Sequence, residues 1–302
     1  MQENSAARAL RVRSPALWIG WLFGFVFAAL TLDPAYVVGK GPYWDALTGD
    51  VAKGEIGWFY YARDDWRFPI FDIATYHYPE GGNIMLSDSL PLLALPAKVV
   101  YKLTSTPDRH PPIHTGLWVA FCLVLQAVAA SRLLRALRVD DVLAHVAGIA
   151  LLCYLPIVML RFGQAGLMAQ GVILLALEGY VRAKREGLRG RQWIALCALA
   201  PLTLLVHPYL TLMCGVIVAA TIFDQWRERR IGVRFVLGGF GSMAALALAL
   251  MLVGGFFSAT KSGFDDYGLY SLNLLSPWIP FPNTLAGSLL GTQYPVIPGT
   301  NQ

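Results

Sequence analysis

The sequence is poor in charged residues, which make up only 14% of its 302 positions. Soluble domains carry about 25% charged residues, so this shortage argues against a soluble protein. The mean hydropathy is +0.52, and the apolar residues gather in long runs that are typical of membrane helices. The net charge of +5 does not indicate nucleic-acid binding, because the basic residues form short clusters between the apolar runs.

Several chemical motifs are also missing. The four cysteines, Cys122, Cys153, Cys197 and Cys214, lie within apolar runs and form no CxxC or Cys/His spacing, which favours packing over redox or zinc roles. The polar segment 38–112 contains no DxD, HExxH or GxSxG motif and no phosphate-cradling glycine loop. The basic N-terminus is not followed by a small-residue cleavage site, so we expect the first apolar run to be a retained anchor.

Seven runs are long and apolar enough to cross a bilayer, which takes roughly 17–25 residues per helix. We expect the spans at residues 16–37, 113–136, 142–161, 165–182, 191–206, 207–225 and 233–257. Pro208 separates the fifth span from the sixth, because proline interrupts a continuous helix and residues 192–225 are too long for one crossing. The predicted fold is therefore an all-α polytopic membrane protein.

The short basic clusters all fall on one side of the predicted membrane. They hold 15 of the 24 basic residues, and the positive-inside rule assigns that side to the cytoplasm. The N-terminus then lies inside, while the segments 38–112 and 258–302 face outside. Because eleven of the 19 acidic residues fall in these two segments and a twelfth, Asp33, lies at the outer end of the first span, we expect the polar machinery on the outer face.

The stretch Met85–Leu103, MLSDSLPLLALPAKVVYKL, has the length of a further span, but charge argues against a crossing. If it crossed, every later helix would invert and three consecutive basic clusters would face outward. We therefore predict a helix over residues 86–103 that lies in the outer interface, with Ser87 or Asp88 as its N-cap.

Aromatic residues and carboxylates are concentrated in the outer segment 38–112. Loops of this length without low complexity are usually functional. Asp50 is the second residue of the stretch GDVAKGEIGWFYY, which predicts a short amphipathic helix with Ile56, Phe59 and Tyr60 on one side. Desolvation at the membrane face raises the pKa of a carboxyl toward the range of a general base. The aromatics, including Trp58, either anchor the loop at the lipid headgroups or contact a sugar or a lipid tail.

Three stretches occur in this order: GDVAKGEIGWFYYARDDWRFPI, LSDSLPLLALPAKVV and RFGQAGLMAQGVILLAL, with VHPYL and GLYSLNLLSPWIP after them. Together they resemble the bacterial multi-spanning membrane proteins of the DUF6311 family, which are similar to polyprenyl-phosphate-dependent glycosyltransferases of the GT-C superfamily. The resemblance covers roughly residues 16–295. It implies a GT-C-like module of seven membrane helices in the bacterial inner membrane, with a large first periplasmic loop.

The resemblance also implies a reaction and its partners. A sugar would pass, with inversion, from a polyprenyl-phosphate carrier to an envelope glycan, lipid or protein acceptor, with membrane lipids around the module and no nucleic acid. Such enzymes resemble one another in using a carboxylate of the first outer loop as base, and Asp50 matches that position. Asp88 is a second acid that could position the acceptor or a divalent cation, although an N-cap role explains it equally well. No other cofactor or metal is implied.

The resemblance also implies residues that contact the substrate. Arg161 lies at the outer end of the third span beside Gln164, and a guanidinium fork matches phosphate oxygens, although a snorkelling arginine is the alternative. His207 and Tyr209, at the junction of the fifth and sixth spans, are candidates for phosphate or sugar contacts, or packing residues. Lys98 is a weaker phosphate candidate, and Trp58 a candidate sugar contact.

Other interpretations stay open. A transporter or lipid-linked-sugar flippase would place polar residues near the bilayer midplane, for which GQAGLMAQG is the best candidate. The resembling proteins continue with further helices, whereas this sequence stops at Gln302. Residues 1–257 would then form the membrane module and 258–302 an outer segment, and an inactive, truncated scaffold is a third interpretation. Glu178 is left out of the site, because Arg182 can pair with it at i,i+4.

Overall fold

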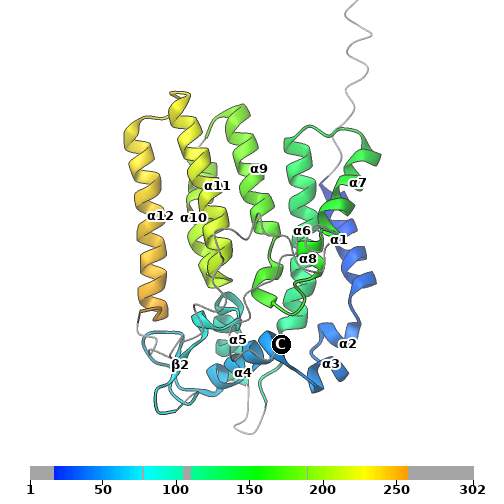
Figure 1. The fold of residues 1–302 in the computed structure, drawn as a ribbon, viewed down its shortest axis with the longest axis vertical. Coiled ribbons are helices and arrows are strands. Elements are labelled where there is room, and N and C mark those ends of the chain that lie inside the picture. The colour runs from blue at the N-terminus through cyan, green and yellow to red at the C-terminus, as the bar shows by residue number, and fades with distance from the viewer. Residues whose placement is uncertain (1–16, 77, 105–109, 189, 258–302) are drawn as a thin grey trace, which may run out of the picture. The chain divides into compact units, whose positions relative to one another are not determined.

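The computed structural model describes residues 17–76, 78–104, 110–188 and 190–257 (Figure 1). They form a bundle of helices with a layer of helices, turns and two short strands at one end. The bundle contains α1 Trp18–Thr31, α6 Thr115–Ala136, α7 Val142–Cys153, α9 Gly171–Glu186, α10 Gly190–Leu202, α11 Pro208–Arg227 and α12 Val233–Gly254. The predicted outer segment 258–302 lies outside the described residues.

The layer at one end, which we call the loop layer, comprises the described residues between 33 and 114. It holds the helices α2 Pro34–Val37, α3 Pro42–Asp45, α4 Gly49–Arg63 and α5 Pro91–Thr104, the strands β1 Asp72–Ile73 and β2 Gly82–Asn83, and the 3-10 turn η1 Ile84–Leu86. Within the bundle, the connections include α8 Pro156–Met159 and the 3-10 turns η2 Ala165–Met168 and η3 Thr203–Leu205.

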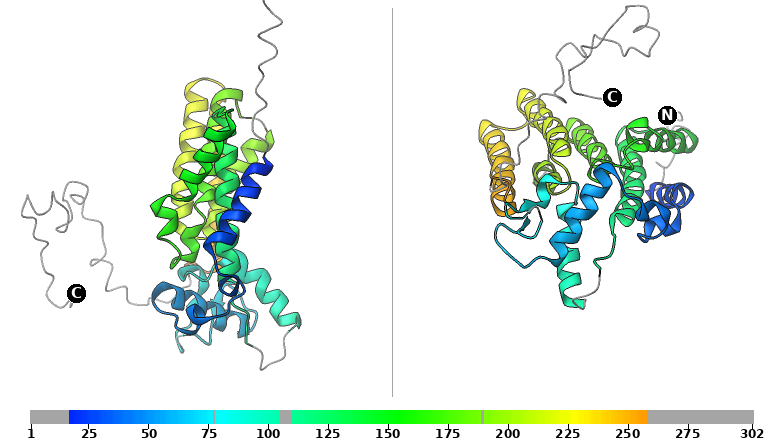
Figure 2. Two further views of the ribbon diagram at one scale, coloured as in Figure 1. Left: turned by 90° about the vertical axis from the view of Figure 1, so that its right-hand side faces the viewer. Right: turned by 60° about the horizontal axis from the view of Figure 1, so that its bottom comes forward.

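Helix α6 organises one half of the bundle, where it packs against α1, α7 and α9 (Figure 2). Helix α9 in turn packs against α11, and α10 packs against both α11 and α12. The largest cluster of buried side chains lies around α6 and includes Val119, Leu123 and Ala127. All four cysteines are free and buried, as expected for packing residues.

Helix α1 approaches α6 closely because glycines occupy the contact positions. A Cβ atom added at Gly20 would lie 2.7 Å from Cβ of Ser131, and one added at Gly24 would lie 2.9 Å from Cα of Val124. Glycines four residues apart share one face of a helix and let two backbones come together. Gly20 and Gly24 of the GWLFG segment therefore lie on the face of α1 that packs on α6.

Replacing Gly24 with isoleucine is expected to destabilise the protein by about 1–3 kcal/mol, because the new side chain must push α1 away from the α6 backbone. The melting temperature of the purified protein in detergent measures this effect. Gly241→Ile in α12 is the matched control, since a Cβ at Gly241 meets no atom of the described residues within 4 Å. Equal melting temperatures for the two variants would contradict the close approach.

Helices cover most of each predicted span, but prolines end some of them early. The first run breaks at Pro34, where Asp33 caps α2 by accepting a hydrogen bond from the Ala35 N–H (2.7 Å). The run 142–161 breaks before Pro156, because the residue that precedes a proline is pushed out of the helical conformation. The predicted break at Pro208 is confirmed, with His207 extended as the N-cap of α11.

Three described helices, α6, α11 and α12, are long and apolar enough to cross a membrane. Helices α1 and α7 and the run Gly190–Leu205 are apolar but shorter. In α12, only 6% of the most apolar 18-residue stretch is buried within the described structure. A helix that is apolar and exposed over most of its surface is suited to contact with lipid.

The loop layer has an apolar core of its own, and the structure adds a small sheet that the all-α prediction did not include. Strand β1 pairs antiparallel with β2, with Asp72 opposite Asn83. The Asn83 amide donates a hydrogen bond to the backbone oxygen of Gly254 (2.7 Å). The Ile70 N–H donates to the oxygen of Val253 (2.9 Å). These bonds attach the loop layer to the end of α12.

The predicted short helix is present as α4, but the side that it buries is not the side that carries Ile56, Phe59 and Tyr60. Ile56 and Tyr60 are exposed, whereas Trp58 and Tyr61 are buried. The Trp58 indole donates a hydrogen bond to the oxygen of Pro112 (3.0 Å), and the Tyr61 hydroxyl donates to the oxygen of Ile70 (3.0 Å). Because their polar atoms find partners, these large aromatics can be buried at little cost.

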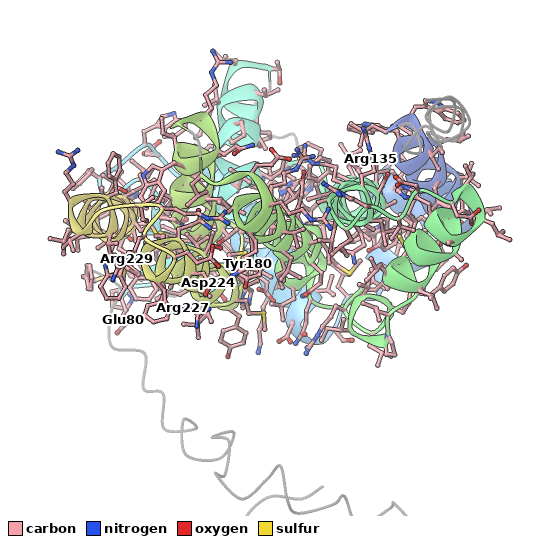
Figure 3. All side chains as sticks on the ribbon, turned by 90° about the horizontal axis from the view of Figure 1, so that it is seen from above. Glu80, Arg135, Tyr180, Asp224, Arg227 and Arg229 are labelled. Atoms are coloured by element: carbon pink, nitrogen blue, oxygen red, sulfur yellow. The ribbon has the colours of Figure 1, made fainter. Side chains whose placement is uncertain are left out.

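The opposite end of the bundle carries the basic loops and is seen from above in Figure 3. Glu178 is buried between Arg132 of α6 and Arg182 of α9, with N–O distances of 2.7 Å to both. The expected pair of Glu178 and Arg182 is therefore confirmed, and Arg132 adds a link between helices. Two residues further along α9, Tyr180 donates a hydrogen bond to Asp224 of α11 (2.8 Å).

Candidate functional site

Five polar side chains from separate parts of the chain come together where the loop layer meets the bundle. Asp50 comes from α4, Asp88 from the segment between η1 and α5, Arg161 and Gln164 from the turns after α8, and His207 from the N-cap of α11. We call these five residues the polar cluster. All five were predicted as site residues from the sequence.

Asp50 lies in the first turn of α4, where the helix N-terminus favours a negative charge. Its Oδ2 atom accepts a hydrogen bond from Gln164 Nε2 (3.3 Å), and its Oδ1 atom lies 3.5 Å from Lys53 Nζ. The side chain is 45% exposed, so a substrate can reach the carboxylate. Lys53 was not predicted, although its i,i+3 spacing from Asp50 signals the pair.

The predicted N-cap role of Ser87 and Asp88 is wrong. Ser87 is the C-cap of η1, and α5 begins only at Pro91. The Asp88 carboxylate points toward the bundle instead, with Oδ1 3.5 Å from Nε2 of His207. Leu90 directly precedes α5 and its carbonyl accepts the first helical hydrogen bond, from the Ala94 N–H, so Asp88 lies two positions before the N-cap.

Small residues of α4 let the Asp88 segment approach. The Ser89 hydroxyl donates a hydrogen bond to the backbone oxygen of Gly54 (2.8 Å). A Cβ atom at Gly54 would lie only 3.0 Å from the backbone oxygen of Asp88. The glycine therefore fixes how close the two acidic segments of the polar cluster lie.

Gln164 bridges the basic and acidic sides of the polar cluster. One guanidinium N–H of Arg161 donates a hydrogen bond to Oε1 of Gln164, while Nε2 of the same amide donates to Asp50. The amide thus couples the position of the Arg161 cation to that of the Asp50 carboxylate.

His207 is oriented by its role as a helix cap. Its Nδ1 accepts a hydrogen bond from the Tyr209 N–H (3.2 Å), which leaves Nε2 directed at Asp88. The Tyr209 ring is 63% exposed and lies 4.9 Å from the His207 ring, at the edge of the polar cluster. Gly166 was not predicted, and a Cβ atom there would lie 3.0 Å from Cδ2 of His207 and 3.3 Å from Oδ1 of Asp88. No sequence motif marks this glycine.

Burial raises the pKa of the Asp88 carboxyl above its usual range. The neighbouring charges act in both directions, because His207 and Lys53 lower this pKa and the negative charge of Asp50 raises it. The net result is a carboxyl that holds its proton more tightly than one in water.

This raised pKa predicts a pH-dependent stability. Because the folded protein binds the Asp88 proton more tightly than the unfolded chain, ionising this group costs stability as the pH rises through the raised pKa. Asp88→Asn is therefore expected to raise the melting temperature at about pH 8 and to leave it unchanged at about pH 3, below the ordinary pKa of an aspartate. Asp45→Asn, at an exposed acid of α3, is the control. A melting temperature lowered at alkaline pH by Asp88→Asn would contradict this account.

The structure does not bring Trp58 and Lys98 to the polar cluster. Their exposures are 2% and 1%, and both lie in the core of the loop layer. Lys98 Nζ lies 4.1 Å from the ring centroid of Tyr61 and 4.7 Å from that of Trp66. Two aromatic rings therefore cover the cation that was a phosphate candidate. The amide of Gln170, in the stretch considered for a transport path, donates to the oxygen of Leu167 within its own turn (2.8 Å).

A further carboxylate of α4 was missed by the sequence reasoning. Glu55 is 8% exposed and accepts a hydrogen bond from the hydroxyl of Thr115, at the start of α6. Burial raises the pKa of Glu55, while the Thr115 hydrogen bond lowers it. This contact joins α4 to α6 and lies outside the polar cluster.

The polar cluster has the groups needed to bind an anion and to move a proton. Arg161 supplies a guanidinium, Asp50 an accessible carboxylate, and Asp88 a carboxyl that keeps its proton to higher pH. Among the residues that the structure describes, no three His, Cys, Asp or Glu side chains are grouped so that they could hold a metal ion.

These features define a helical protein that has apolar helices of membrane-spanning length and a polar cluster at one end of its bundle. The family described as "Domain of unknown function (DUF6311)" matches residues 21–301, and the chain belongs to this family. The match confirms the family resemblance that the sequence motifs indicated. No curated protein and no solved structure matches the chain.

Proposed function

We propose that this protein is a membrane glycosyltransferase of the GT-C type. It moves a sugar from a polyprenyl-phosphate carrier to an envelope glycan, lipid or protein acceptor. The seven apolar segments form the membrane module, and the loop layer faces the periplasmic side of a bacterial inner membrane. The separation of the basic loops and the loop layer to opposite ends of the bundle supports this orientation.

The observation that carries the proposal is the position of the polar cluster. Asp50, Gln164 and Arg161 are linked by hydrogen bonds at the junction of an apolar bundle and a polar layer. A lipid-linked sugar has its tail in the membrane and its phosphate and sugar at this same boundary. A cation for the phosphate and a carboxylate for the acceptor are therefore found where the two parts of such a substrate meet.

In the proposed reaction, Asp50 acts as the general base. It takes the proton of an acceptor hydroxyl while that oxygen attacks the anomeric carbon of the donor. A new glycosidic C–O bond forms, and the bond from the anomeric carbon to the phosphate oxygen breaks. The electron pair of the broken bond leaves with the polyprenyl phosphate, and the anomeric configuration inverts.

The other residues of the polar cluster receive supporting roles. Arg161 binds the phosphate, on which negative charge grows as the bond breaks. Gln164 holds Arg161 and Asp50 in register. Asp88 and His207 are proposed to orient the acceptor, because a carboxyl group and an imidazole nitrogen can both hydrogen-bond to sugar hydroxyls.

The proposal is tested by sugar transfer in nanodiscs. Purified protein is incubated with radiolabelled polyprenyl-phosphate hexoses and an envelope extract as acceptor, and labelled product is expected with an inverted anomeric centre. Movement of the labelled lipid between the leaflets of proteoliposomes, without any labelled product, would overturn the proposal and indicate a flippase.

A further inference from the structure

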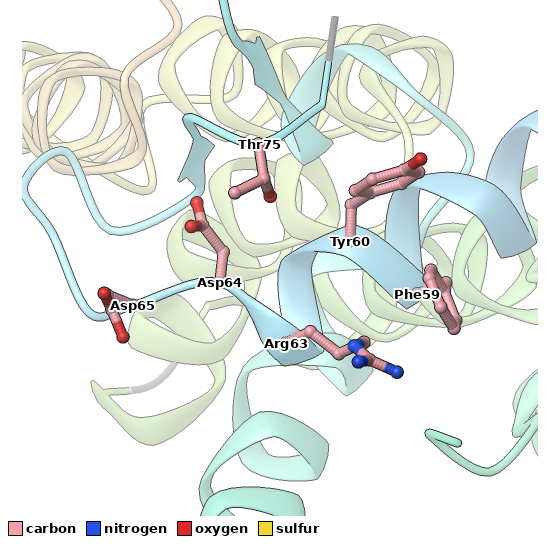
Figure 4. Close-up of a pocket in the computed structure, with 6 residues that line it drawn as sticks. All are labelled: Phe59, Tyr60, Arg63, Asp64, Asp65 and Thr75. Carbon is pink, nitrogen blue, oxygen red and sulfur yellow. The ribbon is translucent and has the colours of Figure 1, made fainter. Parts of the chain in front are cut away.

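The end of α4 far from Asp50 borders a hollow that no residue of the polar cluster lines (Figure 4). It has a volume of about 310 Å³ and is lined by Phe59, Tyr60, Arg63, Asp64, Asp65 and Thr75. Thr75 lies between Asp64 and Tyr60 in Figure 4. This volume falls at the lower end of the range of about 300–1,000 Å³ that small-molecule sites occupy.

The aromatic walls of the hollow are held in place by other rings. The Tyr60 ring, 37% exposed, lies 5.3 Å from the Tyr76 ring. The Phe59 ring stacks on His110, with 5.8 Å between the ring centroids. Rings that are already fixed lose little conformational entropy when a ligand packs against them. Sugars present C–H faces that pack on such rings.

A buried carboxylate fixes the side of the hollow opposite Tyr60. Asp64 is 5% exposed, and it accepts hydrogen bonds from the Ala74 N–H (2.7 Å) and from Arg67 (3.0 Å). These bonds hold the Thr75 segment against the end of α4. The hollow is therefore preformed, which is usual for ligand sites.

The charges of the lining favour a neutral ligand, because the Asp64 carboxylate is already paired with Arg67 (3.0 Å) and the remaining charges of Asp65 and Arg63 are opposite. Two carboxylates and one guanidinium line the hollow, and the Arg63 guanidinium lies 5.2 Å over the Phe59 ring. Asp65 is exposed and repels an anion. The Asp65 carboxylate and the Thr75 hydroxyl accept hydrogen bonds from sugar hydroxyls, and Arg63 donates to sugar oxygens.

We propose that this hollow binds a neutral saccharide chain, which is the acceptor of the transfer reaction; the assignment as acceptor rests on the proposed function. Tyr60 follows Asp50 by ten positions on α4, which is about 15 Å along the helix axis. A single sugar unit does not cover this distance. Only an acceptor with several sugar units occupies the hollow and the polar cluster together.

Binding is tested directly by saturation-transfer NMR on the protein in nanodiscs. The probes are neutral gluco-, manno- and galacto-oligosaccharides and the matching oligouronates. At least one neutral series is expected to bind, with an affinity about tenfold lower in Tyr60→Ala, because the stacking contact is lost. The matched control is Tyr78→Ala, at a tyrosine of the loop layer that is 84% exposed and does not line the hollow. No binding of any neutral probe, or equal binding to Tyr60→Ala, would overturn the proposal.

Kinetics and a second variant separate this proposal from the proposed function. Saccharide binding is expected to persist in Asp50→Asn, because Asp50 does not line the hollow. If the wild-type protein bound saccharide but transferred no sugar, the saccharide site would stand and only its assignment as the acceptor site would fall. In an active enzyme, Tyr60→Ala is expected to raise KM about tenfold for long acceptors and to leave kcat and the KM of single-sugar acceptors unchanged. Equal KM values in Tyr60→Ala and wild type would overturn the acceptor site while leaving the transferase proposal intact.

Discussion

Asp50→Asn is expected to lower the rate of sugar transfer by about 10²–10⁴-fold, the usual contribution of a general base. Asparagine has nearly the shape of aspartate and can keep a hydrogen bond to Gln164, but it cannot accept a proton from the acceptor hydroxyl. Because the loss concerns the chemical step, kcat should fall while KM for the donor changes little. The measurement is the initial rate in nanodiscs at saturating donor and acceptor.

Two controls make this result specific to the base. Asp45→Asn removes an exposed carboxylate of the same loop layer, five positions earlier, and should retain the wild-type rate. The melting temperature of Asp50→Asn should stay close to that of the wild type, because the Asp50 side chain is 45% exposed. A normal rate in Asp50→Asn combined with a large loss in Asp88→Asn would assign the base to Asp88 instead.

The helices could be predicted from the sequence because their signals are local. Each apolar run and each proline acts on residues that are neighbours in the sequence, and the break before Pro208 follows from the missing proline N–H. The inward face of α4 could not be predicted in this way. Trp58 and Tyr61 are buried because they find hydrogen-bond partners at Pro112 and Ile70, and these partners are fixed only by the tertiary fold.

The candidate site was predictable to the extent that its residues follow apolar segments at one end of the bundle. Asp50, Arg161 and His207 each lie at such a position, and the structure brings them together. The pairing of Asp88 with His207 joins residues far apart in the chain, which one sequence does not reveal. Lys98 illustrates the opposite case, because a basic residue near the membrane suits a phosphate until Tyr61 and Trp66 are seen to cover it.

Arg161→Gln is expected to lower kcat/KM for the donor by about 10²–10³-fold, the loss seen when one group that stabilises transition-state charge is removed. The guanidinium is held by Gln164 through one N–H group, and its fork of further N–H groups can bind two phosphate oxygens at once. Arg161→Lys retains the positive charge but not the fork, so its loss should be smaller. Arg191→Gln, at an exposed arginine on the opposite end of the bundle, should leave the kinetics unchanged.

Product inhibition distinguishes phosphate binding from a purely structural role of Arg161. Polyprenyl phosphate carries the group that Arg161 is proposed to hold, so its inhibition constant should rise strongly in Arg161→Gln and less in Arg161→Lys. In Asp50→Asn, by contrast, the same constant should stay near its wild-type value, because the base does not touch the leaving phosphate. If Arg161→Gln slowed transfer without weakening product inhibition, Arg161 would act by positioning Gln164 and Asp50, and the phosphate site would lie elsewhere.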